Sequence, residues 1–296
     1  MSDENRISIV TVCDNHFSVL LAALLKSLEL NHHSGELIDI FIVSDKISSK
    51  NKEYLNKSIS TSSILLHWLD MQQVIPPRWT IPVDNSSFPL NVYVRLFIPY
   101  FIPEHLDKIL FLDADMIVLK DISDLWKTDM SNHIIAGVVD KSKVVSSTWG
   151  GIPNYKELGL DPQTKYFNAG LQLINPKKWR DLNYTDQLME IGRVNKEHVK
   201  WGDQYYLNVA FANKWLELDA RWNWYAVFEH QDPYIIHFVG TKPIYASYNY
   251  VKSFKDEFYK YLSLTPYKNP KPISEFKRNA KKYYNLIEKK LSSIFK

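Results

Sequence analysis

Two aspartates separated by one small residue follow a strongly apolar run in the middle of the chain. Residues 108–112 (KILFL) predict a buried strand, and Asp113-Ala114-Asp115 comes directly after it. In an extended chain, residues two apart point to the same side, so the two carboxylates can converge where the strand ends. Hard oxygen ligands suit Mg²⁺ or Mn²⁺, so the pair predicts a divalent metal site. The same pair could instead form a turn or cap a helix.

A histidine near the end of the chain could complete this ligand set. His237 follows the strand-like residues 234–236 and begins the run HFVGTKP. Imidazole beside a glycine-containing turn can ligate a metal or titrate, and with two carboxylates it favours Mn²⁺. Gly240 would allow the backbone to approach a ligand, and Lys242 could meet a phosphate as a point charge. By itself, a single histidine is more often a structural residue.

Three further polar groups lie in segments that predict turns or helix starts. Asn168-Ala169 precedes Gly170 and a strand, and an amide before small residues suits a turn that touches a polyhydroxylated ligand. Asp203-Gln204 begins a helical stretch, where an acid can also serve only the helix dipole. Arg95 lies in the segment before the Asp pair.

The elements that must position these residues alternate between strand and helix. Residues 7–12, 37–43 and 63–69 predict strands, with helical segments between them. This order predicts an α/β fold with a parallel sheet, which binds ligands beyond the carboxyl ends of its strands. Asp14 and Asn15 follow the first strand directly. Later segments predict strands at 134–139, 167–175 and 234–238, helices at 92–102, 177–194 and 202–213, and loops at 74–91 and 141–165.

Composition restricts the class of protein. With 296 residues and 45% apolar content, the chain can bury a sizeable core. Cys13 is the single cysteine, so no intrachain disulfide forms and a reducing compartment is expected. The first ten residues lack the pattern of a signal peptide, and no apolar stretch reaches the length of a membrane-spanning helix. We therefore expect a cytoplasmic protein.

Charge is distributed unevenly along the chain. From residue 252 onward twelve Lys and Arg face four Asp and Glu, a local +8, so the net +3 leaves −5 for the rest. An acidic body argues against a nucleic-acid partner. We expect a catalytic domain over 1–245 and a basic, aromatic, helical extension over 246–296, with an irregular break near 245–272.

The last 24 residues have the pattern of an amphipathic helix. Apolar residues recur every three or four positions, at Ile273, Phe276, Ala280, Tyr283, Ile287, Leu291 and Ile294, with Phe295 beside them. The polar positions are mainly basic, at Lys277, Arg278, Lys281, Lys282, Lys289, Lys290 and Lys296, against Glu275 and Glu288. Such a helix can lie on the inner, anionic face of a membrane, or its apolar stripe can dock on the catalytic body.

Taken in chain order, these segments resemble glycosyltransferase family 8, which includes glycogenin and bacterial lipopolysaccharide α-galactosyl- and α-glucosyltransferases. The resemblance runs from about residue 7 to about 245, and the ordered series is more specific than any one motif. It comprises Asp14-Asn15, Arg95, Asp113-Ala114-Asp115, Asn168-Ala169-Gly170, Asp203-Gln204 and the run from His237 to Pro243. The family implies a GT-A fold, with a Rossmann-like, mostly parallel, nucleotide-sugar-binding sheet.

The resemblance also implies a reaction. A hexose, glucose or galactose, would pass from its UDP-sugar to a glycan, glycoprotein or glycolipid acceptor. Mn²⁺ would be the cofactor, and the anomeric configuration would be retained, giving an α-linkage. The implied metal ligands are Asp113, Asp115 and His237. The other implied donor contacts are Thr11, Asp14 and Asn15 near the uridine, Gly240 and Lys242 on the phosphates, and Arg95, Asn168, Ala169, Asp203 and Gln204 around the sugar. Ala114, between the two aspartates, is also an implied donor contact.

Some details stay open. Cys13, His16 and Ile244 depart from residues that the family often carries, which affects base recognition more than the metal site. Gln204 and Asp203 are the implied catalytic residues, since the Gln204 carbonyl could offer a lone pair to an oxocarbenium-like sugar. The alternatives are a metal-dependent phosphatase with an aspartate nucleophile and a catalytically inactive sugar-binding relative.

Overall fold

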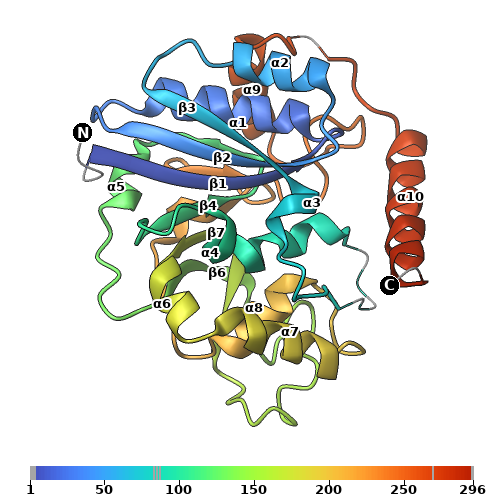
Figure 1. Cartoon of the computed structure of the whole chain (residues 1–296). Coiled ribbons are helices and arrows are strands. Elements are labelled where there is room, and N and C mark those ends of the chain that lie inside the picture. The colour runs from blue at the N-terminus through green and yellow to red at the C-terminus, as the bar shows by residue number, and fades with distance from the viewer. Residues whose placement is uncertain (1–4, 83, 85, 87, 269, 295–296) are drawn as a thin grey trace. The chain divides into compact units, whose positions relative to one another are not determined.

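The structure is a computed structural model that describes residues 5–82, 84, 86, 88–268 and 270–294 (Figure 1). It divides into two compact units, each built from several chain segments. Unit 1 comprises Met1–Met71, Leu110–Asp129 and Asp219–Asn279. Unit 2 comprises Gln72–Ile109, Met130–Leu218 and Ala280–Lys296.

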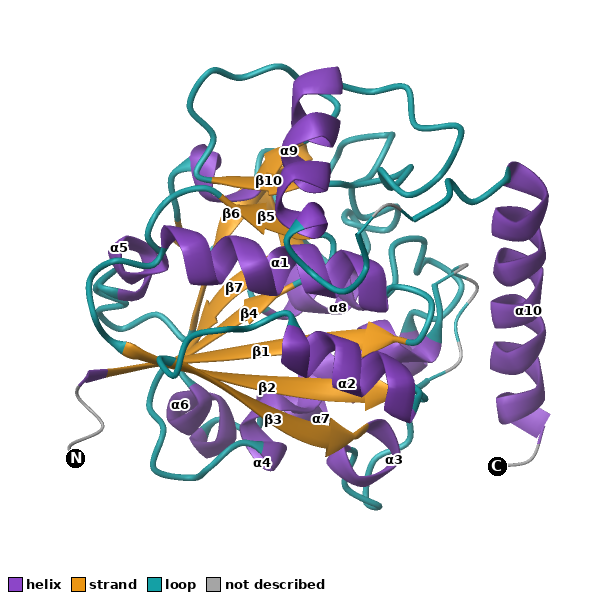
Figure 2. Cartoon of the chain, turned by 90° about the horizontal axis from the view of Figure 1, so that it is seen from above, coloured by secondary structure: helices purple, strands orange, loops and turns teal. Residues whose placement is uncertain are grey.

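Unit 1 contains a parallel sheet with the strand order β3-β2-β1-β4. Its strands are rich in β-branched and aliphatic residues, as expected for strands covered on both faces. Figures 1 and 2 show β1, β2 and β3 side by side, with helices α1 and α2 over one face. The parallel sheet predicted from the alternating pattern is confirmed. The strands are β1 (Arg6–Asp14), β2 (Leu37–Asp45), β3 (Ile64–Asp70) and β4 (Ile109–Leu112).

Helix α1 (Ser18–Asn31) is buried along most of its length because it packs against α9 as well as the sheet. Helix α9 (Lys252–Ser263) lies within the segment where the sequence predicted an irregular break, so that expectation is wrong. Phe254, Phe258, Tyr261 and Leu262 recur at helical spacing and are buried. Tyrosines and lysines lie between these apolar residues, so the helical spacing was not recognised in the sequence. The other helices of unit 1 are α2 (Ser49–Lys57), α5 (Ile122–Trp126) and η3 (Ala220–Asn223).

A second, three-stranded sheet in unit 1 has the order β5-β10-β9, and β10 is antiparallel to β5. Strand β5 does not continue directly from β4, because residues 113–115 turn between them. The sequence analysis expected Asp113 and Asp115 to converge because they alternate along an extended strand. They converge instead because they lie in a turn. The strands are β5 (Met116–Val118), β9 (Trp224–Tyr225) and β10 (Ile235–His237).

Unit 2 is built on strands in the order β7-β6-β8, with β6 antiparallel to β7 and parallel to β8. The helix expected over 177–194 is two helices, because Asn183 adopts a left-handed conformation (φ 52°) between them. The strands are β6 (Ile135–Val144), β7 (Lys165–Ile174) and β8 (Leu216–Glu217). The helices are η2 (Leu90–Phe97), α4 (Ile98–Phe101), α6 (Pro176–Asp181), α7 (Tyr184–Val194) and α8 (Asp203–Ala210), and α3 (Met71–Val74) lies at the unit boundary.

Helix α10 (Glu275–Ile294) confirms the helix predicted near the end of the chain. Phe276, Tyr283, Tyr284 and Ile287 are exposed on it. Within the part of the chain that the structure describes, no helix combines the length and apolarity needed to cross a bilayer. The division of the chain at residue 245 stays a prediction. Outside the described residues lie Phe295 and Lys296, and also the side chains of Lys282, Glu288, Lys289, Lys290, Leu291 and Ile294.

Candidate active site

Asp113, Asp115 and His237 lie together in unit 1, with one possible ligand atom of each within 4.8 Å of the others. Nε2 of His237 is 3.3 Å from Oδ1 of Asp115 and 3.8 Å from Oδ2 of Asp113. His237 is buried, while Asp113 keeps part of its side chain exposed. Two carboxylates and one imidazole form a ligand set that suits Mn²⁺.

Backbone pairing brings these distant residues into contact. His237 pairs with Met116 across the antiparallel strands β10 and β5, so it lies one residue from Asp115 in the register. The pairing extends past the strand ends, because the amide of Phe238 donates to the carbonyl of Asp115 over 3.0 Å. The site is thus held by a sheet rather than by side-chain contacts alone.

Asn223 orients the His237 ring. Its Oδ1 lies 2.8 Å from Nδ1 of His237, and an amide oxygen only accepts hydrogen bonds. Nδ1 therefore carries the proton, and the Nε2 lone pair faces the two carboxylates. This arrangement is the usual second contact of a metal-binding histidine. Sequence reasoning missed Asn223, because nothing in its neighbourhood marks it apart from other polar residues.

A cation already neutralises one of the two carboxylates. Nζ of Lys242 forms an ion pair with Asp115 and donates to the carbonyl of Phe238 over 2.7 Å. Burial acts to raise the pKa of Asp115, but the adjacent Lys242 ammonium holds that pKa well below its usual range. The cluster therefore keeps Asp115 ionised and ready to bind a cation, and its donor atoms fit a divalent metal.

The residues that the resemblance assigns to the uridine lie where β1 ends. Oγ1 of Thr11 is buried and has no hydrogen-bond partner among the described residues. The Asp14 carboxylate accepts from the amide of Phe17 over 2.9 Å at the start of α1. Oδ1 of Asn15 accepts from the amide of Ser48 over 2.9 Å. Asp14 and Asn15 thus shape the turns around this strand end.

The three departures from the family pattern occupy the same region. Cys13 is buried, and burial raises the pKa of its thiol well above the usual value. Nε2 of His16 lies 3.0 Å from the hydroxyl of Tyr245, and the two rings stack with centroids 6.0 Å apart. Ile244 is buried beside Tyr245 in the chain.

Gly240 has a φ of +80°, which favours glycine in this turn.

A second polar cluster lies in unit 2 and links three side chains. Nδ2 of Asn168 donates to Oδ2 of Asp140 and to Oε1 of Gln204, over 3.1 Å in each case. The amide of Ala169 also donates to Oε1 of Gln204, over 3.0 Å, and Nε2 of Gln204 donates to Asp140 over 3.3 Å. Both lone pairs of Oε1 are therefore engaged by the protein. Asp140 directly follows the strand predicted at 134–139, which is the same signal that marked Asp113.

Arg95 and Asp203 form a buried ion pair next to this cluster. Nε of Arg95 lies 2.8 Å from Oδ2 of Asp203, and both side chains are almost fully buried. Arg95 also donates to the carbonyl of Ala169. A buried pair with additional hydrogen bonds fixes its geometry firmly. All five residues that the resemblance assigns to the donor sugar therefore lie in one network within unit 2.

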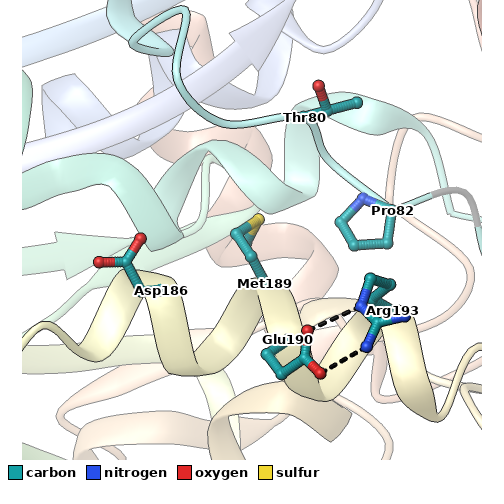
Figure 3. Close-up of a pocket in the computed structure, with 6 residues that line it drawn as sticks. All are labelled: Thr80, Pro82, Asp186, Met189, Glu190 and Arg193. Atoms are coloured by element: carbon teal, nitrogen blue, oxygen red, sulfur yellow. Dashed lines mark hydrogen bonds and ion pairs between the residues drawn. The ribbon is translucent and has the colours of Figure 1, made fainter.

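A separate hollow in unit 2 contains none of the predicted site residues (Figure 3). Its charged side chains include Glu190 and Arg193, which bind one another through two hydrogen bonds of 2.6 and 2.7 Å. Asp186 accepts from Nε1 of Trp79 over 2.6 Å, so the charged groups of this hollow are engaged by the protein. Its lining residues are Thr80, Pro82, Asp186, Met189, Glu190 and Arg193.

The family model described as "Glycosyl transferase family 8" matches residues 8–243. General stress protein A of Bacillus subtilis is 24% identical over 286 residues, covering 90% of this chain and 96% of that protein. Lipopolysaccharide 1,2-glucosyltransferase of Escherichia coli is 23% identical, with 95% and 86% covered. Glycosyltransferase GlyB of Streptococcus pneumoniae is 26% identical, and the match covers 81% of this chain but 58% of GlyB.

Solved structures share the fold. The galactosyltransferase LgtC, in complex with donor and acceptor sugar analogues, superposes with a TM-score of 0.71 at 22% identity. That match covers 88% of this chain and 96% of LgtC. The bifunctional glycosyltransferase WbbM gives a TM-score of 0.75 at 22% identity, but this chain spans 51% of its length. The fold is the GT-A type that the sequence predicted.

Proposed function

The chain belongs to glycosyltransferase family 8, and we propose that it is a retaining, Mn²⁺-dependent hexosyltransferase. Its donor would be UDP-glucose or UDP-galactose, and its acceptor a glycan, alone or on a protein or lipid. The product would carry an α-glycosidic link. Family membership supports glycosyl transfer itself, while the donor, the metal and the stereochemistry are the parts that we propose.

One observation carries this proposal. Asp113, Asp115 and the oriented Nε2 of His237 converge within 4.8 Å, with Lys242 beside them. This set would hold Mn²⁺ on the diphosphate of the donor. When bound, the ion would act as a Lewis acid on the departing diphosphate.

The chain's own residues have distinct parts in this proposal. Lys242 would leave Asp115 for the diphosphate and neutralise part of the charge that develops as the anomeric bond breaks. Thr11 offers its buried, unpartnered hydroxyl to the nucleotide. The deprotonation of the acceptor hydroxyl falls to a phosphate oxygen of the donor, on the same face as the departing group.

In unit 2, we propose that the cluster of Arg95, Asn168, Ala169, Asp203 and Gln204 binds the hydroxyls of the donor sugar. Because both lone pairs of Gln204 Oε1 are engaged, this oxygen must release one partner before it can face the anomeric carbon. The Arg95–Asp203 pair would hold the helix start that carries Gln204. Asp203 would thus act mainly by positioning.

Two alternatives were open from the sequence. Membership of family 8 removes the reason to consider a phosphatase with an aspartate nucleophile. The inactive relative is the alternative that the next experiment addresses, because members of one fold can bind sugar without turnover.

The test is a panel of UDP-glucose, UDP-galactose and UDP-N-acetylglucosamine, with release of UDP measured with and without Mn²⁺. Slow hydrolysis reports the donor even when the acceptor is unknown. We expect release from one of the two hexose donors, and we expect a chelator to stop it. No release from any donor would support the inactive relative instead.

We further propose that helix α10 places the enzyme at the inner, anionic face of a membrane. Its start is attached to unit 1, because Ile273 pairs with Tyr245 and Arg278 lies 5.1 Å from the Tyr245 ring. Beyond that attachment, Tyr283 and Ile287 are exposed, and the sequence around them is rich in lysine. Exposed apolar side chains with a basic polar face are typical of an interfacial helix.

Vesicle flotation tests this role. A chain that ends at Asn279 keeps the contacts of Ile273 and Arg278 with unit 1 and loses most of the helix. We expect the full chain to float with phosphatidylglycerol vesicles and to float less with them at high salt. We expect it not to bind phosphatidylcholine vesicles. The shortened chain should remain unbound. Equal flotation of the two chains would refute the role.

A further inference from the structure

An exposed tryptophan, Trp149, packs beside a half-buried one, Trp201, in unit 2, and we call this pair the indole platform. Trp149 is 55% exposed, and its ring centroid lies 5.2 Å from that of Trp201 at an interplanar angle of 42°. Nζ of Lys141 lies 4.8 Å from the Trp149 centroid. Neither indole N–H donates a hydrogen bond to another described residue. An indole exposed to this degree, with its donor available, is unusual for a residue that serves only packing.

The loop that carries Trp149 is held tightly. A Cβ on Gly150 would lie 2.1 Å from Oγ of Ser142, and one on Gly151 would lie 2.2 Å from the carbonyl of Val145. Only glycine allows this close approach. The amide of Ile152 donates to the carbonyl of Val145 over 2.7 Å, which closes the loop on β6. The exposed indole is therefore presented by a fixed backbone, as a preformed binding surface requires.

Contacts through Ser142 link the platform to the polar cluster of unit 2. The amide of Ser142 donates to Oδ1 of Asp140 over 2.8 Å, and Oδ2 of Asp140 accepts from Asn168 and Gln204. The Cβ position at Gly150 lies 2.1 Å from Oγ of Ser142 and 3.7 Å from Nε1 of Trp201. Oγ of Ser142, on the same strand, is buried without a hydrogen-bond partner among the described residues. The two indoles, on the loop after β6 and just before α8, thus lie close to a strand that carries the carboxylate of the polar cluster.

We propose that the indole platform binds a hexopyranose ring of the acceptor, next to the cluster that we assign to the donor sugar. This inference rests on the proposed glycosyl transfer and specifies the acceptor class. A pyranose has a face of C–H groups that can cover an indole and a rim of hydroxyls that can meet indole N–H groups and Lys141. The platform would therefore determine which acceptor sugars the enzyme accepts.

The dimensions and chemistry favour a sugar over other occupants. A stable protein partner needs about 800 Å² of surface on each side, far more than two indoles provide. A nucleobase could also stack on an indole, but it lacks the ring of hydroxyls that the adjacent polar cluster suits. The proximity of Asn168 and Gln204 therefore favours a polyhydroxylated ligand.

Saturation-transfer NMR tests the proposal directly, with methyl β-D-galactopyranoside, methyl β-D-glucopyranoside and lactose as probes and with UDP and diamagnetic Mg²⁺ present. We expect transfer to the ring C–H protons of at least one glycoside. Trp149→Ala should weaken that glycoside's binding about tenfold or more, and Trp149→Leu should do the same, since it keeps an apolar side chain but no ring. Trp149→Phe should retain most of the binding.

Phe228→Ala is the matched control, because Phe228 is an exposed aromatic residue of unit 1. It should leave glycoside binding unchanged. No transfer to any of the three glycosides in the natural protein overturns the proposal, and so does unchanged binding in Trp149→Ala. Glycoside binding requires no turnover, whereas UDP release tests the proposed function, so the two claims can fail separately.

Discussion

The two polar clusters of this protein are built in contrasting ways. In unit 1, backbone pairing of β5 and β10 positions Asp113, Asp115 and His237, and their charges are balanced by Lys242, which can exchange partners. In unit 2, Arg95, Asp140 and Gln204 are cross-linked by side-chain hydrogen bonds and a buried ion pair. The difference indicates that the first cluster can lose a side chain without losing its scaffold. The second cluster contributes to the stability of unit 2 and also carries the residues that we assign to the donor sugar.

The largest expected effect is the loss of activity in Asp113→Asn. Removing one anionic ligand should weaken Mn²⁺ binding and cost several kcal/mol of transition-state stabilisation, roughly a thousandfold in rate or more. Because Asp113 is part exposed and the sheet holds the turn, the melting temperature should stay close to that of the natural protein. UDP release and thermal unfolding measure the two effects. Asp70→Asn, at the end of β3, is the matched control and should behave normally.

The opposite behaviour is expected in unit 2. Arg95→Leu leaves the Asp203 carboxylate buried without its partner, which should destabilise the protein by about 3–5 kcal/mol as well as reduce activity. Denaturant unfolding measures the change in free energy. Arg193→Leu removes the arginine of an exposed pair with Glu190 and should change stability little. If Arg95→Leu unfolds like the natural protein, the contrast between the clusters is wrong.

Asn223 gives a finer test of the metal cluster. Asn223→Ala should lower the affinity for Mn²⁺ about 10–100-fold, since the His237 ring loses the acceptor that fixes its tautomer. Asn223→Asp retains an acceptor oxygen for Nδ1 and should restore most of the affinity. Mn²⁺ titration of UDP release distinguishes these results from a general loss of stability, which excess metal would not reverse.

The smallest expected effect concerns Gly240. Gly240→Ala should cost about 1 kcal/mol of stability, because φ is +80° and a Cβ would lie 3.0 Å from the Tyr250 hydroxyl. Gly35 also has a positive φ, but open space surrounds its Cβ position. Gly35→Ala should therefore carry the backbone strain without affecting the KM for the UDP-sugar, and Gly240→Ala should raise that KM. Equal KM values would remove Gly240 from the donor site.

Much of this organisation could be predicted from the sequence because its signals are local. The alternating strands and helices of residues 7–69 predicted the parallel sheet, and a buried strand ending in Asp113 predicted the carboxylate pair. The reason for their convergence was wrong, since residues 113–115 form a turn rather than an extended chain. Helix α9 was missed because tyrosines and lysines obscure its apolar period.

Contacts between distant segments could not be predicted. Asn223 and His237 meet only because β9 and β10 pair, and Tyr245 meets His16 across most of the chain. The same holds for the indole platform, whose two rings are 52 residues apart in sequence and approach through the close turn at Gly150-Gly151. Such sites depend on tertiary packing, which residue spacing does not report.

Calorimetric titration of UDP into the protein, with and without Mn²⁺, tests the central claim most directly. The account predicts that UDP binds tightly only with Mn²⁺ and that Asp113→Asn abolishes this metal-dependent binding while the protein stays folded. Equal UDP affinity with and without Mn²⁺ in the natural protein, or unaltered metal dependence in Asp113→Asn, would contradict the assignment of Asp113, Asp115 and His237 as the metal site.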